Sequence, residues 1–109
     1  MAQFSINPVS AILGTSAALI HTVPAGTEQT LTGSLANFTT ADVTVSLWVV
    51  EPGGTRANQH TRLPDYVVTA KEPRKMIERE SFPPGTMFYA GASAANSVSM
   101  QFTGTSRGV

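Results

Sequence analysis

Few side chains in this sequence could carry acid–base or metal chemistry. There are two histidines, His21 and His60, and no cysteine. Neither histidine has a second histidine or a carboxylate at the spacing of a metal site, so we interpret both as hydrogen-bonded or solvated residues. Glu51 and Asp65 are isolated carboxylates beside turns, whereas general acid–base catalysis needs groups close together. We therefore predict no catalytic residue, no metal site and no cofactor. A triad assembled across the fold is the alternative, since it would be visible only in its geometry, and nothing in the sequence points to one.

Aromatic side chains are the other groups that could bind a ligand. Trp48, Tyr66, Tyr89 and Phe88 could stack on sugars or bases. Trp48 stands among valines, which favours a buried or half-buried core position over an exposed stacking platform. A carbohydrate-binding or adhesion module that uses Trp48, Tyr66 or Tyr89 is therefore an alternative function and not the leading one.

The charge of the chain is balanced and low. Seven acidic and seven basic residues cancel, and charged residues make up only 13% of the chain. Long-range attraction to nucleic acid or to an anionic membrane is therefore not expected to organise its function. No apolar run approaches the ~18 residues needed to span a bilayer, and the N-terminus lacks the basic start of a signal peptide. We predict a soluble protein that is made without export and binds neither nucleic acid directly nor a membrane.

The elements that would position these side chains are β-strands. Between residues 43 and 50, Val43, Val45, Leu47 and Val49 share one face, and Thr44, Ser46, Trp48 and Val50 share the other. Gly and Pro separate such segments, and no connection is long enough to hold a crossover helix. We predict one all-β domain over residues 1–109, an antiparallel β-sandwich of jelly-roll or immunoglobulin-like type. Its seven predicted strands cover residues 19–23, 29–38, 42–51, 62–69, 74–82, 86–92 and 96–105.

Half of the charged residues lie in the segment KEPRKMIERE, which has seven of them among ten residues at 71–80. Mixed charge along a strand discourages edge-to-edge pairing, so the segment fits a solvated sheet edge. The alternative is a salt-bridging contact with a neighbouring subunit. The residues that would make this contact are Arg74, Lys75, Glu78 and Arg79.

The N-terminal segment has the opposite character, because residues 1–27 contain no charged side chain. An uncharged segment rich in large apolar residues would be a poor free tail in water, so we expect it to pack against something. Residues 1–13 either form a first strand of their own domain or extend as an arm that adds a strand to another subunit. The apolar residues concerned are Phe4, Ile6, Val9, Ile12 and Leu13.

Two long stretches of the chain resemble small β-sandwich virion proteins of tailed bacteriophages. These stretches are LGTSAALIHTVPAGTEQTLTGSLANFTTADVTVSLWVV and FPPGTMFYAGASAANSVSMQFTGT, and the resemblance covers roughly residues 13–104. It rests on turn and core patterns such as TVPAG, VTVSLWVV and PGTMFYA. The resemblance implies no catalytic residues. The residues to which it gives an architectural role at turns are Pro24, Gly26, Asn37, Gly85 and Gly104.

The resemblance implies a multicopy, non-enzymatic structural protein that decorates or stabilises a phage capsid. A neck or tail accessory protein is the alternative within the same class. In either case the expected partners are other virion proteins and copies of the chain itself. The expected location is the virion, after synthesis in the cytoplasm of a bacterial host.

Overall fold

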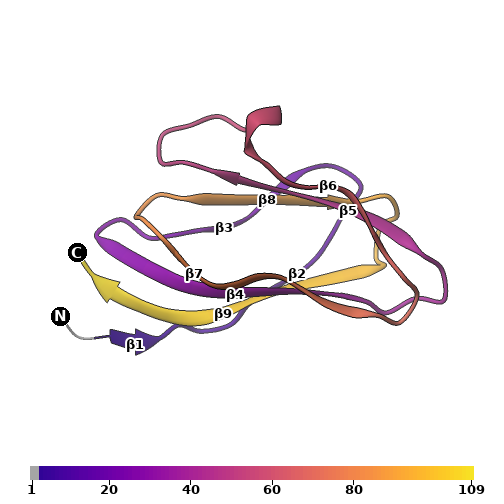
Figure 1. Cartoon of the computed structure of the whole chain (residues 1–109), viewed down its shortest axis with the longest axis horizontal. Coiled ribbons are helices and arrows are strands. Elements are labelled where there is room, and N and C mark those ends of the chain that lie inside the picture. The colour runs from indigo at the N-terminus through magenta and orange to yellow at the C-terminus, as the bar shows by residue number, and fades with distance from the viewer. Residues whose placement is uncertain (1–2) are drawn as a thin grey trace.

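The computed structural model describes residues 3–109 as two antiparallel sheets packed face to face (Figure 1). One sheet has the strand order β1-β9-β4-β7, with β2 also paired to β9, and the other has the order β3-β8-β5-β6. A short 3-10 helix, η1, precedes β6. The elements are β1 (Gln3–Ser5), β2 (Val9–Ile12), β3 (Ala18–Thr22), β4 (Thr27–Asn37), β5 (Val43–Val50), η1 (Asn58–His60), β6 (Thr61–Val68), β7 (Pro73–Phe82), β8 (Met87–Ala92) and β9 (Val98–Gly108).

The strand pairing is nested, so that the chain resembles one long hairpin wrapped into two layers. β5 pairs with β6, β4 with β7, β3 with β8 and β2 with β9. Apart from the β5–β6 hairpin, successive strands from β2 to β9 alternate between the two sheets. This connectivity is that of a jelly roll. The predicted antiparallel β-sandwich is confirmed, and of the two types predicted the structure has the first.

The core lies between the sheets and comes from the alternating positions of the long strands. In β4, every second residue from Gln29 to Asn37 is buried, which is the period expected of a strand with one covered face. Phe82, Phe88 and Phe102 form an aromatic cluster, with ring centroids 4.9 Å and 5.0 Å apart for the two pairs that include Phe88. This close packing joins the two layers, because Phe88 lies on one sheet and Phe82 and Phe102 lie on the other.

All seven predicted strands are present, with ends that differ by up to three residues. The largest difference between a predicted and an observed strand end is in β9, which runs to Gly108 instead of ending at residue 105. The predicted side-chain alternation of β5 is present from Val43 to Leu47, with Val43, Val45 and Leu47 in the core and Val49 packed against it. It breaks at the end of the strand, where Val50, predicted for the other face, is fully buried. Trp48 is half-buried, but on the outer face of the sheet and not in the core.

The N-terminal segment lies along the β9 edge of a sheet in its own chain. β1 and β2 both pair with β9, and the register slips by one residue between them, around Pro8. Ile6 and Val9 pack against the core, whereas Phe4 and Ile12 are 58% and 60% exposed. Leu13 is fully buried in the core, so this member of the predicted contact set is not available to a neighbouring subunit. Residues 1 and 2 of the predicted arm lie outside the described residues.

Four of the five predicted turn residues lie at or beside connections. Gly26 and Gly85 have φ values of 76° and 86°, which glycine adopts without strain. Asn37 ends β4 and is buried. The prediction for Gly104 is wrong, because this residue lies inside β9 opposite Leu31 and not at a turn. A side chain there would place its Cβ 2.0 Å from the carbonyl oxygen of Thr30, so glycine is needed for a close approach of two strands.

The charged segment forms β7, an outer strand of its sheet. The guanidinium of Arg74 lies 5.5 Å from the ring centroid of Tyr66 on β6, and Arg62 on β6 forms an ion pair with Glu80. These contacts join the open edges of the two sheets. Lys75 and Glu78 pair with each other at 3.7 Å. Much of the charge on β7 therefore has partners within the chain, although the four predicted contact residues remain exposed.

Candidate functional site

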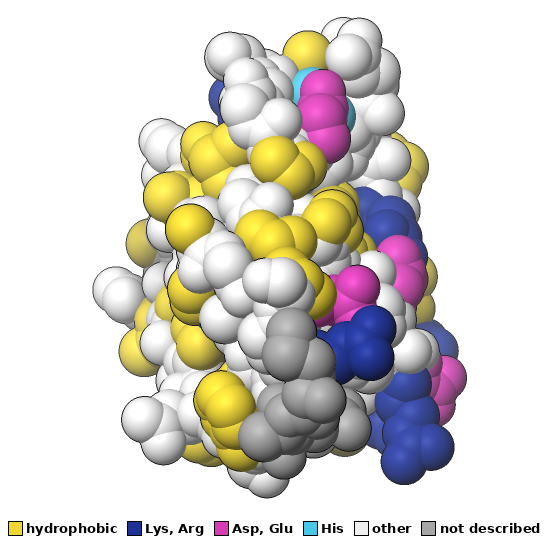
Figure 2. Space-filling model, turned by 90° about the vertical axis from the view of Figure 1, so that its left-hand side faces the viewer, with side chains coloured by type: hydrophobic (Ala, Val, Ile, Leu, Met, Phe, Trp, Pro, Cys, Tyr) yellow, Lys and Arg dark blue, Asp and Glu magenta, His cyan; other side chains and the backbone are white. Residues whose placement is uncertain are grey.

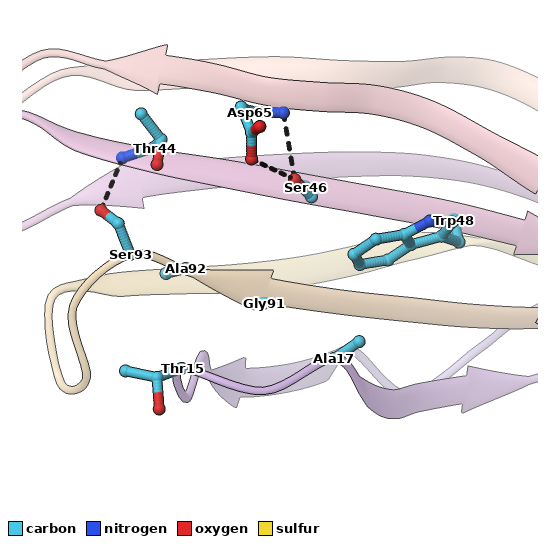
Figure 3. Close-up of a pocket in the computed structure, with 9 residues that line it drawn as sticks. All are labelled: Thr15, Ala17, Thr44, Ser46, Trp48, Asp65, Gly91, Ala92 and Ser93. Carbon is cyan, nitrogen blue, oxygen red and sulfur yellow. Dashed lines mark hydrogen bonds between the residues drawn. The ribbon is translucent and has the colours of Figure 1, made fainter. Parts of the chain in front are cut away.

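One hollow in the described part of the chain lies on the outer face of the β3-β8-β5-β6 sheet (Figure 3). Its volume is about 270 Å³, close to the lower end of ligand pockets, which begin near ~300 Å³. We call it the Gly91 hollow, after the glycine among its lining residues. Its lining residues are Thr15, Ala17, Thr44, Ser46, Trp48, Asp65, Gly91, Ala92 and Ser93.

A row of large side chains on the outer face of the sheet ends at a glycine beside the hollow. Trp48 on β5 pairs with Tyr89 on β8, and Tyr89 pairs with Leu19 on β3, so the three form a row across the outer face. The next outward position on β8 is Gly91, opposite Ser46. Since Gly91 has no side chain, the backbone of residues 16–17 passes close over it, and a Cβ there would lie 3.1 Å from the Ser16 carbonyl oxygen. The indole of Trp48 stands at one end of the hollow (Figure 3).

Asp65 supplies the only carboxylate that lines the hollow. Its backbone has a φ of 43°, a left-handed conformation that Asp tolerates better than most residues. The β5–β6 pairing is irregular at this point, between Val45 and Leu47. The hydroxyl of Ser46 donates to Oδ1 of Asp65 at 3.1 Å and accepts the Asp65 N–H at 3.0 Å. The strand irregularity therefore turns the carboxylate outward and Ser46 holds it there (Figure 3).

Trp48 is held from the other side by the loop between β5 and β6. The guanidinium of Arg56 lies 4.8 Å from the centroid of the indole, a cation–π distance. Arg56 does not line the hollow.

This loop is closed by a side-chain hydrogen bond that the sequence did not indicate. Nε2 of His60 lies 2.6 Å from Oε2 of Glu51, and Nδ1 of His60 accepts the N–H of Ala57 at 2.9 Å. A hydrogen bond from its own backbone N–H, together with the hydrogen bond from His60, lowers the pKa of the Glu51 carboxyl below its ordinary value. Glu51 is thus not isolated, and the two residues are nine positions apart in the sequence.

The remaining side chains considered for chemistry do not join this site. Tyr66 packs against the core at the edge of β6, and Tyr89 bonds weakly through its hydroxyl to the sulfur of Met87 at 3.9 Å. Phe88 is fully buried. Nε2 of His21 lies 2.8 Å from Oε1 of Gln29, and its ring stacks on Phe88. His21 and Asp65 are therefore not brought together, and no group of three or more metal-ligating side chains occurs in residues 3–109.

A second surface feature is the end of the sandwich where three turns meet. Each turn has a hydrogen bond from the N–H of its fourth residue to the carbonyl of its first, and a glycine with positive φ at its third position, so all three are of type II. They lie next to one another, since Gly85 donates to the carbonyl of Val23 and a Cβ on Gly85 would lie 3.0 Å from Pro52. The turns are Pro24–Thr27, Glu51–Gly54 and Pro83–Thr86.

Apolar side chains gather at this end of the molecule, and charged ones lie along one border and at the top (Figure 2). The terminal N–H of Val109 bonds to the carbonyl of Gly26, and β1 pairs with the last residues of β9 beside the same turn. We call this surface the turn end. It comprises the exposed residues Phe4, Pro24, Ala25, Pro52, Pro83 and Val109.

No protein-family model, curated protein or solved structure matches this chain. Among the described residues, no helix is long and apolar enough to cross a membrane.

Proposed function

We propose that this chain is a multicopy structural protein of a tailed-bacteriophage particle that decorates or stabilises the capsid. The observation that carries the proposal is the turn end, where exposed apolar side chains from the N-terminus, three turns and the C-terminus form one surface. The sequence resemblance to small virion proteins supports the same function. Jelly rolls occur in viral capsid and lectin domains, so the fold fits the proposal without selecting it.

The physical properties of the turn end suit a protein contact. Its turns are fixed by proline rings and internal hydrogen bonds, as when the hydroxyls of Thr27 and Thr86 donate to the carbonyls of Pro24 and Pro83 at 2.8 Å and 2.9 Å. Prolines lose almost no side-chain entropy when an interface forms. A rigid apolar surface of this kind loses little freedom on binding and gains from the removal of water.

The proposed role also explains how the protein would strengthen a particle. A protein that binds the assembled shell but not its dissociated subunits stabilises the shell by mass action. Many copies, each contacting neighbouring shell subunits and other copies of itself, would add many small contributions. Particles that lack the protein should then open at a lower temperature than complete particles.

A charge placed on the turn end tests the proposal. We expect Ala25→Glu, at the exposed tip of the first turn, to fold normally and to lose at least about tenfold in binding to particles made without the protein, because the new carboxylate must be desolvated at the interface. The matched control is Ala95→Glu, which makes the same change in the exposed turn between β8 and β9 at the opposite end. Equal binding by both variants would contradict the proposed contact surface.

The location within the particle distinguishes decoration from the neck or tail alternative. If the protein decorates the capsid, its loss should lower the heat resistance of the shell. Loss of a neck or tail protein should leave shell strength unchanged and should block head–tail joining or infection. Thermal release of DNA from particles with and without the protein measures this difference.

A further inference from the structure

We propose that the Gly91 hollow is a binding site for one ring of a neutral saccharide. In this site Asp65 accepts hydrogen bonds from ring hydroxyls and the Trp48 indole contacts the C–H groups of the ring. The proposal does not depend on the function proposed above, because it uses another face of the molecule and holds with or without a particle.

The geometry at Asp65 carries the first step. A non-glycine residue with positive φ is uncommon, and such conformations concentrate at binding sites. Here the conformation directs a carboxylate outward over a hollow, and the Ser46 hydroxyl fixes its Oδ1 at 3.1 Å. An ionised carboxylate has about four acceptor positions, so it can accept further hydrogen bonds from a ligand.

The charges around the hollow select a neutral ligand. Asp65 lines the hollow and disfavours phosphates and carboxylates, which removes nucleotides and acidic sugars. Arg56 lies 4.8 Å from the indole centroid and disfavours a second cation beside Trp48. A ligand rich in hydroxyl donors but without net charge meets both conditions.

The composition and size of the hollow point to a sugar ring. Trp48 provides an apolar wall at one end, and the hydroxyls of Thr15, Thr44 and Ser93 lie along the rest. The Ser93 hydroxyl is already oriented, because it accepts the N–H of Thr44 at 3.0 Å. This mixture of one aromatic surface and several placed polar groups matches the two faces of a pyranose, and the volume of about 270 Å³ suits one ring.

Trp48 is the only tryptophan of the chain, so its fluorescence reports on this site alone. The probes are methyl α-D-glucopyranoside, methyl α-D-mannopyranoside and methyl β-D-galactopyranoside. Ligands of this size bind with a dissociation constant on the order of 1 mM, so each is titrated to about 50 mM. We expect at least one of them to shift the emission of Trp48 with a saturating curve.

Two variants and a second readout complete the test. Asp65→Asn keeps the shape and tolerates the same backbone, and we expect it to weaken binding at least about tenfold, as for the loss of a charged hydrogen-bond acceptor. Glu78→Gln removes one negative charge from β7 of the other sheet and should bind like the parent protein. Shifts of the Gly91 and Ser93 amide resonances provide a readout that does not depend on fluorescence.

Three results would each overturn the proposal. The first is the absence of any fluorescence or amide shift with all three glycosides. The second is binding that Asp65→Asn leaves unchanged. The third is a saturating response to arginine methyl ester without a response to the glycosides, which would make the hollow a site for a partner's cationic side chain.

Discussion

At the scale of single residues, Asn37 contributes more than its predicted role at a turn. Its amide nitrogen donates to the carbonyls of Ala41 and Val68, and its oxygen accepts from the N–H and hydroxyl of Thr39. Val68 ends β6 of the opposite sheet, so Asn37 joins the two layers where β4 ends. Because Asn37 is only 2% exposed, these bonds are shielded from water.

We expect Asn37→Ala to lower the free energy of unfolding by about 2–3 kcal/mol, because it leaves buried carbonyls without a donor. Asn58→Ala, at an exposed position in η1, should change it by less than about 0.5 kcal/mol. Urea unfolding followed by circular dichroism measures both values. Equal values for the two variants would show that Asn37 acts only as a turn residue.

The Glu51 carboxylate predicts a dependence of stability on pH, because hydrogen bonds from its own backbone N–H and from His60 favour its charged form. The pKa of Glu51 is lowered in the folded protein, so its contribution to stability is present above the ordinary value of 4.5 and is lost as the pH falls through the lower folded value. Between about pH 5 and 3 the melting temperature of the parent protein should fall more than that of Glu51→Gln. Differential scanning calorimetry across this range tests the expectation, and parallel curves for the two proteins would contradict it.

At the scale of elements, the close approach of β4 and β9 depends on one missing side chain. A Cβ on Gly104 would lie 2.0 Å from the Thr30 carbonyl oxygen, so neither strand could keep its position. We expect Gly104→Ala to cost at least about 3 kcal/mol or to prevent folding. Gly14→Ala, where a Cβ would meet nothing within 4 Å, is the matched control. Similar melting temperatures for the two variants would contradict this account of β9.

The sequence predicted the strands because their side chains alternate and their turns carry Pro and Gly at positions that type II turns require. β1 and β2 were harder to predict, since they are short and Pro8 interrupts the pattern. The Gly91 hollow could not be predicted. It depends on which residue of β8 lies beside Trp48 and on the irregular β5–β6 pairing that turns Asp65 outward, and neither is visible without the register.

At the scale of the whole molecule, the N-terminal segment is part of the sandwich in the isolated chain. Removal of residues 1–13 would uncover the edge of β9 and remove the fully buried Leu13. We expect the truncated chain to lose about 3 kcal/mol or more, the scale of a large core deletion together with lost strand pairing. Chemical denaturation measures this loss. A truncated chain of unchanged stability that no longer binds particles would instead identify the segment as an inter-subunit arm.

The two faces proposed to bind partners lie on different parts of the molecule. The turn end is formed by connections and both termini, whereas the Gly91 hollow lies on the outer face of one sheet. One copy could therefore contact the shell through the turn end and leave the hollow open to solvent. Ala25→Glu should weaken only the first interaction and Asp65→Asn only the second, and binding assays for each partner would detect any coupling between them.

The most direct test of the structural role is a reconstruction of purified particles by electron cryomicroscopy, with mass spectrometry of the same sample. The account predicts many copies of the two-layered sandwich on the shell, with the turn end facing a neighbouring subunit. Absence of the chain from the particles, or copies that contact the shell through another face, would contradict it.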